Sequence, residues 1–323
     1  MKKTTSPLVR GAIPAITLPR TQPAWPGEFQ ITDSEFRKFR ELVLRHTGIS
    51  LAPHKREMLK ARLGRRLRAL GIASFSDYYQ YLSQSDATGE ELGRMINAVT
   101  TNVTEFFRED HHFKFMTQTW IPACQRELGR PRVLRIWSAG CSTGEEPYTI
   151  AIVLREALGP LLSSWDIRIL ASDIDTDALG RAQAGIYFRD KIAPISESQL
   201  RRHFLCGRGP EAGFVRIRPE VQNLVTFRRL NLLDDPWPIR TRFDAIFCRN
   251  VMIYFDRPAQ QHLVRRFAGF LKDDGLLFLG HSEGLNGMNA GLVSCQHTIY
   301  QRTAANSLTG GRASVTEVQH EKG

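Results

Sequence analysis

Beyond residue 130 the chain alternates short apolar runs with longer amphipathic stretches, and no other feature constrains its fold as strongly. Short apolar runs bounded by polar residues are typical of buried strands, and the longer stretches repeat apolar side chains at helical spacing. The expected strands are 133–137, 167–171, 224–227, 243–248 and 276–279, and the expected helices are 145–158, 175–184 and 257–271. This alternation predicts an α/β fold, with a mostly parallel sheet and helices on both faces.

One interval of this region, 186–223, is too long for a loop between a helix and a strand. It holds a helix-start pattern at Ser196 and a strand-like run at 214–217, with glycines around that run. We therefore expect a small β-subdomain, 186–223, inserted into the α/β domain.

The region 29–100 shows only helical patterns and predicts a separate helical domain. Thr32 and Glu35 match a capping box, in which each side chain satisfies a free backbone N–H at a helix start. A second helix is expected at about 54–70, ending at Gly71, with a leucine stripe along its buried face. A chain of 323 residues has room for about two such domains.

The two ends of the chain have a different composition. Residues 1–28 hold five prolines and little apolar periodicity, so we expect a disordered basic tail, and the polar segment 304–323 predicts a second disordered tail. Five scattered cysteines argue against a disulfide scaffold and against a metal site of the CxxC type. Without a spanning apolar run or a convincing signal peptide, we expect a cytoplasmic protein with no membrane insertion.

The formal net charge of the chain is +11, which predicts an acidic partner. Nucleic acid, anionic lipid and an acidic protein surface all fit this charge. Charge alone does not choose among them.

A glycine-bearing turn between the first expected strand and helix carries the strongest local signal. Gly140 and Gly144 would let a ligand approach the backbone, and the following helix start offers free N–H groups. In a doubly wound sheet, a nucleotide-like cofactor binds at this place. The alternative is that both glycines serve only the turn.

A second signal lies where the next strand ends. Asp173, about 30 residues after the glycine turn, is placed to accept hydrogen bonds from both hydroxyls of a ribose. Capping of the next helix is the alternative for an aspartate here. We assign the ribose to Asp173 and the cap to Asp175.

The same turn also matches the G-x-S-x-G pattern at 140–144 that α/β-hydrolases use for a nucleophilic serine. With Ser142 as the nucleophile and His281 after a late strand, an esterase is the alternative function. Against it, the serine would sit on the first strand of the sheet, and the acidic strand end would have no purpose.

Two further segments supply polar side chains. In 100–109, Asn102 with Glu105 could cap a helix, but capping does not explain Arg108, so we expect this segment to line a polar cleft. In 243–255, a strand ends before Arg249 and Tyr254, at the sheet edge where this architecture binds its ligand.

Several long blocks of the sequence, in their order along the chain, resemble the CheR family of bacterial chemotaxis receptor methyltransferases. The blocks are TTNVTEFFRED with HHF, WSAGCSTGEEPYTIA, ASDIDTDAL, FDAIFCRNVMIYF and LLFLGHSE, and the resemblance spans about 30–302. It implies a helical N-terminal domain (29–100), a linker helix and cofactor-cleft lining (101–130), and a Rossmann-like class I methyltransferase domain (131–303) with an inserted β-subdomain. It implies methyl transfer from S-adenosyl-L-methionine, giving S-adenosyl-L-homocysteine, to receptor glutamates in chemotactic adaptation.

This chemistry needs no general base. A glutamate with a pKa of about 4.3 is already ionised at neutral pH, so the nucleophile needs only alignment and desolvation. Arg108 can hold the carboxylate through two hydrogen bonds, and the Tyr254 hydroxyl can orient it. The resemblance likewise places both residues near the transferred methyl group.

The cofactor roles follow from the resemblance and from position. We expect Asn102 and Thr104 to reach the cofactor from the N-terminal side, Asp173 to bind the ribose, and either Glu145 or Glu146 to meet the methionyl ammonium. Asn231 and Leu232 are expected beside the adenine, and Arg249 and Asn250 at the methionyl end. Arg108 and Gly140 complete the expected cofactor residues. No metal is expected.

Basic residues are concentrated on the second expected helix. Between Lys55 and Arg68 seven Lys and Arg residues accompany a single acidic residue, and a helical wheel turns Arg62, Arg65 and Arg68 outward. Since the receptor's methylated region is expected to be an acidic helical coiled coil, we expect these three residues to dock it. A solvated helix face is the alternative.

A nucleic-acid methyltransferase would also be basic, but the sequence lacks its motifs. No Asp/Asn-Pro-Pro-aromatic turn follows the fourth strand, and no cysteine follows a proline. We expect no nucleic-acid partner and a monomeric enzyme.

Overall fold

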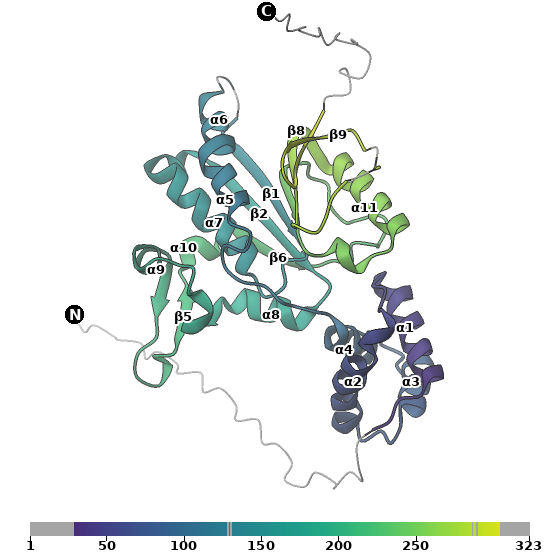
Figure 1. The fold of residues 1–323 in the computed structure, drawn as a ribbon. Helices are drawn as coiled ribbons and strands as arrows, with labels where there is room; N and C mark the ends of the chain where they lie inside the picture. The colour runs from purple at the N-terminus through teal and green to yellow at the C-terminus, as the bar shows by residue number, and fades with distance from the viewer. Residues whose placement is uncertain (1–28, 128, 130, 286, 289, 304–323) are drawn as a thin grey trace, which may run out of the picture.

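The structure is a computed structural model, and it describes residues 29–303 except 128, 130, 286 and 289 (Figure 1). The two tails predicted to be disordered, 1–28 and 304–323, lie outside the described residues. A helical domain, a large mixed sheet with its helices, and a small antiparallel sheet follow one another along the chain, which confirms the expected fold class.

The large sheet has seven strands in the order β6-β2-β1-β7-β8-β10-β9. The strands are β1 (Val133–Ala139), β2 (Asp166–Asp173), β6 (Val225–Arg229), β7 (Phe243–Cys248), β8 (Leu271–Leu279), β9 (Leu292–Gln296) and β10 (Ile299–Arg302). The first five pair in parallel, whereas β10 is antiparallel to both β8 and β9. The strand order reverses between β1 and β7, which is the point where doubly wound sheets bind ligands.

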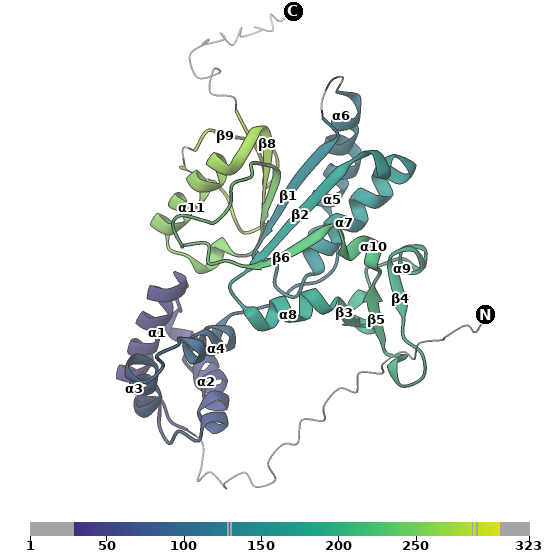
Figure 2. The ribbon, with the colours of Figure 1, turned by 180° about the vertical axis from the view of Figure 1, so that it is seen from behind.

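Apolar side chains on the two faces of the sheet build separate cores. On β1, Leu134 and Ile136 belong to one core, and Trp137 belongs to the other, as the alternation of a strand requires. The first core is covered by α5 (His111–Phe115), the π-helical η2 (Met116–Trp120), α6 (Ile121–Arg126), α7 (Glu145–Leu158) and α8 (Thr176–Ala184). The second is covered by α11 (Arg257–Phe270), on the other side of the strands (Figures 1 and 2). Short 3-10 turns, η3 (Gly159–Ser164) and η6 (Met252–Tyr254), complete the connections.

The interval 186–223, predicted to be a small β-subdomain, holds a three-stranded antiparallel sheet in the order β3-β5-β4. Its elements are β3 (Ile186–Phe188), η4 (Arg189–Ile192), α9 (Glu197–His203), β4 (Phe204–Cys206), η5 (Gly209–Glu211), β5 (Phe214–Ile217) and α10 (Pro219–Gln222). Ser196 and Gln199 form the capping box of α9. Tyr187 and Phe204 pack edge-on against Phe106, so the subdomain shares the core of the main domain.

The helical domain consists of α1 (Asp33–Thr47), η1 (Pro53–Lys55), α2 (Arg56–Leu70), α3 (Phe75–Gln84) and α4 (Glu90–Val99). The capping box of Thr32 and Glu35 is present, and Gly48 and Gly71 end α1 and α2 in the left-handed conformation. Leu59, Leu63 and Leu67 of the leucine stripe are fully buried in this domain's own core.

Hydrogen bonds join the helical domain to the carboxyl ends of the sheet strands. Asn97 exchanges two hydrogen bonds with Thr176 at the start of α8. On the other side, the Ser50 N–H donates to the Tyr254 carbonyl at 2.8 Å. The helical domain therefore lies against the edge of the sheet at which ligands bind (Figure 2). Across the described residues, every helix is too short or too polar to cross a bilayer.

Candidate active site

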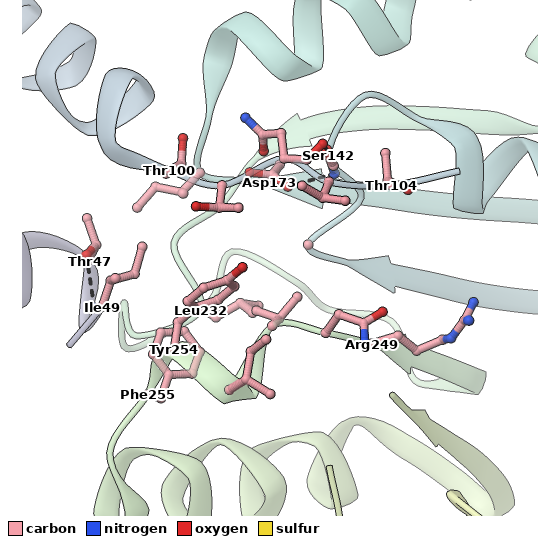
Figure 3. Close-up of a pocket in the computed structure, with 18 of the residues that line it drawn as sticks. Thr47, Ile49, Thr100, Thr104, Ser142, Asp173, Leu232, Arg249, Tyr254 and Phe255 are labelled. Atoms are coloured by element: carbon pink, nitrogen blue, oxygen red, sulfur yellow. Dashed lines mark hydrogen bonds between the residues drawn. The ribbon is translucent and has the colours of Figure 1, made fainter. Parts of the chain in front are cut away.

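A cavity of about 360 Å³ lies where the carboxyl ends of β1, β2, β6 and β7 meet the helical domain. Figure 3 shows Asp173, Ser142 and Thr104 on one side of it, and Leu232 and Tyr254 on the other. Most of the side chains predicted for the site line this cavity: Asn102, Thr104, Arg108, Gly140, Glu146, Asp173, Asn231, Leu232, Arg249, Asn250 and Tyr254. Glu145 and the three arginines of α2 lie outside its lining.

The glycine turn after β1 packs closely against the loop after β7. Gly140 has a φ of +86°, and a Cβ atom at this position would lie 2.3 Å from Cγ2 of Val251. Both Gly140 and Val251 line the cavity. Glycine is therefore needed here for its backbone conformation and for a close approach at the wall of the site.

Asp173 ends β2 with its carboxylate at the cavity. Its Oδ2 atom accepts the N–H of Ser142 at 2.8 Å, and its Oδ1 atom accepts the N–H of Asp175 at 2.9 Å. Burial raises the pKa of Asp173 above its ordinary value, although these two N–H donors oppose the shift. The group is an acidic hydrogen-bond acceptor, held rigidly by two backbone segments.

Asp175 is the helix cap, as predicted. Its Oδ1 atom accepts the N–H groups of Asp177 and Ala178 at the start of α8. Its Oδ2 atom accepts hydrogen bonds from Thr100 Oγ1 at 2.7 Å and from Asn102 Nδ2 at 2.6 Å. The cap therefore also fixes the polar segment that leads out of the helical domain.

The alternative interpretation of Asn102 as a helix cap is wrong. No helix begins there within the described residues, since α5 starts only at His111. The side chain of Asn102 instead reaches Asp175, a partner far away in the sequence. Residues 101–105 have no regular secondary structure and line the cavity, and Arg108 Nη1 donates to the Val103 carbonyl at 2.8 Å.

A buried ion-pair network lies at the β7 end of the cavity. The guanidinium of Arg249 contacts Glu146 at 3.1 Å and Glu109 at 3.2 Å, and it also donates to the carbonyl of Arg108. Burial raises the pKa of Glu146, and Arg249 opposes that shift. Burial would also raise the pKa of Glu109, but Arg249 and the hydrogen bonds from Asn250 and His281 outweigh it and lower this pKa.

The two adjacent glutamates of α7 have different surroundings. The Glu146 carboxylate accepts Ser138 Oγ at 2.7 Å and faces Arg249 beside the cavity. The Glu145 carboxylate accepts Thr143 Oγ1 at 2.6 Å, away from the cavity lining. Of the two, only Glu146 is placed to meet a ligand in this cavity.

Asn231 and Leu232 follow β6 at the same rim. Asn231 Nδ2 donates to the His46 carbonyl and to Asp234, each at 3.0 Å, which ties this loop to the end of α1. Leu232 presents an apolar surface to the cavity and is only 7% exposed. Leu232 therefore gives this part of the wall an apolar surface.

The serine of the G-x-S-x-G pattern has no histidine partner. Ser142 Oγ donates to the Asn102 carbonyl at 3.3 Å, and the His281 ring pairs with the His111 ring at 3.2 Å. Among the hydrogen bonds of the described residues, none joins Ser142 to His281. The pair that a serine esterase needs is not formed.

The basic face of α2 is smaller than the helical wheel predicted. Arg65 and Arg68 are exposed, but the prediction that Arg62 projects outward is wrong. Arg62 Nη1 donates to the carbonyls of Val99 and Thr100 at 2.9 and 2.6 Å, because the last carbonyls of α4 lack helical partners and lie within its reach.

Three other basic residues of this stretch are also engaged within the domain. Arg56 pairs with Asp33, Lys60 with Glu57, and Arg66 with the buried Glu91. Lys55, by contrast, lines the cavity. The basic surface of α2 that is left for an external partner therefore centres on Arg65 and Arg68.

Two buried glutamates beside the cavity were missed in the sequence. Glu109 is part of the Arg249 network, and Glu283, which is 6% exposed, accepts backbone N–H groups of the loop after β7. Both lie inside the blocks quoted for the family resemblance, which was the only signal available for them. No group of three or more His, Cys, Asp or Glu side chains in the described part of the chain is arranged to hold a metal ion.

Comparisons with known proteins identify the family of this chain. The family profile described as "CheR methyltransferase, SAM binding domain" matches residues 102–301, and the one described as "CheR methyltransferase, all-alpha domain" matches residues 34–100. A "Chemotaxis protein methyltransferase" of Klebsiella aerogenes is 44% identical over 303 residues, which cover 94% of this chain and 99% of the relative. The relative of that name in Escherichia coli K12 is 44% identical over 270 residues, covering 84% of this chain and 91% of its own.

Proposed function

The chain belongs to the CheR methyltransferase family, and we propose that it methylates glutamate side chains of chemoreceptors with S-adenosylmethionine as the donor. The observation that carries this proposal is that Arg108 and Tyr254 line the same cavity as the acidic and glycine residues expected to bind the donor. A site built in this way can bring an anionic acceptor and a cationic donor together.

The cavity fits S-adenosylmethionine in its polar and apolar parts. Asp173 offers an anchored carboxylate for ribose hydroxyls, and Leu232 offers an apolar wall for adenine. At the other end the buried carboxylate of Glu146 suits an ammonium group, and the neighbouring Arg249 suits a carboxylate. The close approach of Gly140 to Val251 leaves no room for a side chain at the turn between these two ends.

When bound, S-adenosylmethionine supplies a methyl group on a positively charged sulfur. The acceptor carboxylate is already ionised at neutral pH, because the ordinary pKa of a glutamate is about 4.3. We therefore assign Arg108 and Tyr254 to holding and orienting the carboxylate, and we assign no residue to proton removal. Equal binding of the carboxylate before and during transfer would not raise the rate, so both residues act through placement.

The acceptor is proposed to be an acidic helical segment in the cytoplasmic region of a receptor. The exposed Arg65 and Arg68 of α2, and Lys55 at the cavity, supply the complementary charge. Docking through exposed charges acts mainly on the association rate and weakens with salt. The cytoplasmic location and the monomeric state remain predictions.

The test is transfer of label from methyl-tritiated S-adenosylmethionine to the cytoplasmic fragment of a chemoreceptor. We expect label that is released by mild alkali, as a carboxyl methyl ester requires, and none on a receptor whose methylated glutamates are replaced by glutamine. Arg108→Ala should abolish transfer and leave S-adenosylhomocysteine binding measurable. Label that resists alkali, or that appears on RNA instead of the receptor, would contradict the proposal.

A further inference from the structure

Glu283 is a buried carboxylate that accepts several backbone N–H groups from a loop of the active site. One oxygen, Oε2, accepts the N–H of Asn250 at 2.8 Å and that of Gly280 at 2.7 Å. The other, Oε1, accepts the N–H of Val251 at 2.9 Å and that of Ile253 at 3.3 Å. Three of these four donors belong to the segment 250–253, so the carboxylate fixes the backbone path of that segment, and the fourth, from Gly280, ties the carboxylate to the end of β8.

This segment leads directly to Tyr254. It runs into the 3-10 turn η6 (Met252–Tyr254), and its Val251 side chain packs on the glycine turn at the wall of the cavity. Asn250 adopts a φ of +59°, in the left-handed region that residues other than glycine adopt less readily. Such a conformation persists only where its surroundings hold it, and the hydrogen bonds to Glu283 do so on both sides of Asn250.

A second glutamate, Glu109, contacts side chains of the same loop instead of its backbone. Glu109 accepts Asn250 Nδ2 at 3.2 Å and pairs with Arg249, and Arg249 also donates to the carbonyl of Arg108. The backbone of Arg108 and the loop of Tyr254 are thus parts of one network. A change in the loop path moves Tyr254 relative to Arg108.

The geometry around Glu283 is tight. A Cβ atom on Gly280 would lie 2.7 Å from Asn250 Nδ2 and 2.8 Å from Oε2 of Glu283. Burial raises the pKa of Glu283, while its backbone donors oppose the shift. A carboxylate in these surroundings is stable only while its hydrogen bonds are made, so its position and that of the loop depend on each other.

We propose that Glu283 is the positioning residue for methyl transfer: it holds the 250–253 backbone so that Tyr254 meets the acceptor carboxylate opposite Arg108. This inference rests on the proposed function. It assigns Glu283 no contact with donor or acceptor, only control of where Tyr254 lies.

The test is a double-mutant cycle on the full chain, measured with receptor fragment and saturating S-adenosylmethionine. Glu283→Gln leaves one acceptor oxygen and turns an NH₂ group toward N–H donors, so the loop shifts. Because a displacement of about 1 Å can lower a rate a hundredfold, we expect kcat to fall about tenfold to a hundredfold while the receptor KM changes less than about threefold. In a Tyr254→Phe background the same substitution should lower kcat by less than about threefold, since the group that it positions is gone.

Asp244→Asn is the matched control for loss of a buried carboxylate. Asp244 is 2% exposed and pairs with Lys272 at 2.8 Å, near the start of β7 and far along that strand from the cavity. This variant should lower the thermal midpoint and leave kcat unchanged. Glu283→Asp keeps the charge on a shorter side chain and should recover part of kcat.

If Glu283→Gln does not fold, Gly280→Ala perturbs the same contact and retains the carboxylate, and the same cycle with Tyr254→Phe applies. An unchanged kcat, or equal losses with and without the Tyr254 hydroxyl, would overturn the inference. The proposed function fails separately, if the unaltered chain places no alkali-labile label on the receptor.

Discussion

Gly140→Ala is the substitution whose effect the structure determines most directly. The residue has a φ of +86°, and the added methyl group would lie 2.3 Å from Cγ2 of Val251. Real Cβ atoms do not approach another carbon so closely, so the turn or the Val251 side chain must move. Both of these groups form the wall of the proposed cofactor site.

Two contributions make up the expected loss of stability. The left-handed backbone costs an alanine about 1–2 kcal/mol, and forcing a methyl group into a packed contact costs about 1–3 kcal/mol more. We therefore expect the free energy of unfolding to fall by about 2–5 kcal/mol. Gly71→Ala isolates the first contribution, because Gly71 has a φ of +70° and no atom lies within 4 Å of the place that an added Cβ would take, so its loss should be about 1–2 kcal/mol.

The assays are urea unfolding and calorimetric titration with S-adenosylhomocysteine. Gly140→Ala should weaken binding about tenfold or more, since a shift of a few tenths of an ångström at the wall disturbs the cofactor contacts, whereas Gly71→Ala should bind normally. Adding Val251→Ala to Gly140→Ala should relieve the stability loss that comes from the methyl contact. The loss that comes from the left-handed backbone should remain. Equal stability losses for Gly140→Ala and Gly71→Ala, with unchanged binding in both, would refute the reasoning.

Three further predictions concern charge. Asp173→Asn should weaken S-adenosylhomocysteine binding about tenfold in calorimetry, and unchanged affinity would remove Asp173 from the ribose site. Burial raises the pKa of Asp173 and of Glu146, and a bound ammonium would favour the ionised form of Glu146. The pKa of Glu146 should therefore fall on binding, so affinity should drop as the pH is lowered toward the ordinary glutamate pKa of about 4.3. Binding in that range should release a proton, measured in buffers of different ionisation enthalpy, and a pH-independent affinity would contradict this. Reversing Arg65 and Arg68 to Glu should raise the receptor KM about tenfold at low salt and spare S-adenosylhomocysteine binding. Arg62→Ala should instead lower the thermal midpoint. A normal receptor KM in the double reversal would eliminate the docking surface.

Much of the fold was predictable because its signals are local. The capping box at Thr32 needs only residues three apart in the sequence, and the strand at 243–248 needs only a short apolar run. The edge hairpin of β9 and β10 was not predicted. Four of the five residues of β9 are exposed, so the strand lacks the apolar pattern that reveals a buried one.

The position of the site was predictable from a rule of topology. Parallel strands end at one edge of the sheet, so Gly140, Asp173, Asn231 and Arg249 had to come together once the strands were placed. The partners of individual side chains were not predictable in this way. The carbonyls that Arg62 meets lie 37 and 38 residues away in the sequence, and no helical wheel contains them.

Buried carboxylates were the least visible feature. Glu283 accepts N–H groups from a loop about 30 residues before it, and Glu109 pairs with an arginine 140 residues away. Hydropathy patterns assign a glutamate to the surface unless a partner is known. Such residues are found only when the backbone that they support has been placed.

The proposed mechanism places an anionic oxygen against the donor and removes no proton. The direct measurement is the single-turnover rate of methyl transfer at saturating S-adenosylmethionine and receptor, followed across pH. A glutamate nucleophile with a pKa of about 4.3 predicts a rate that is flat between about pH 6.5 and 8.5. A rate that rises about tenfold per pH unit within that range, and levels off at the pKa of one side chain, would show that a base is required and would contradict the account.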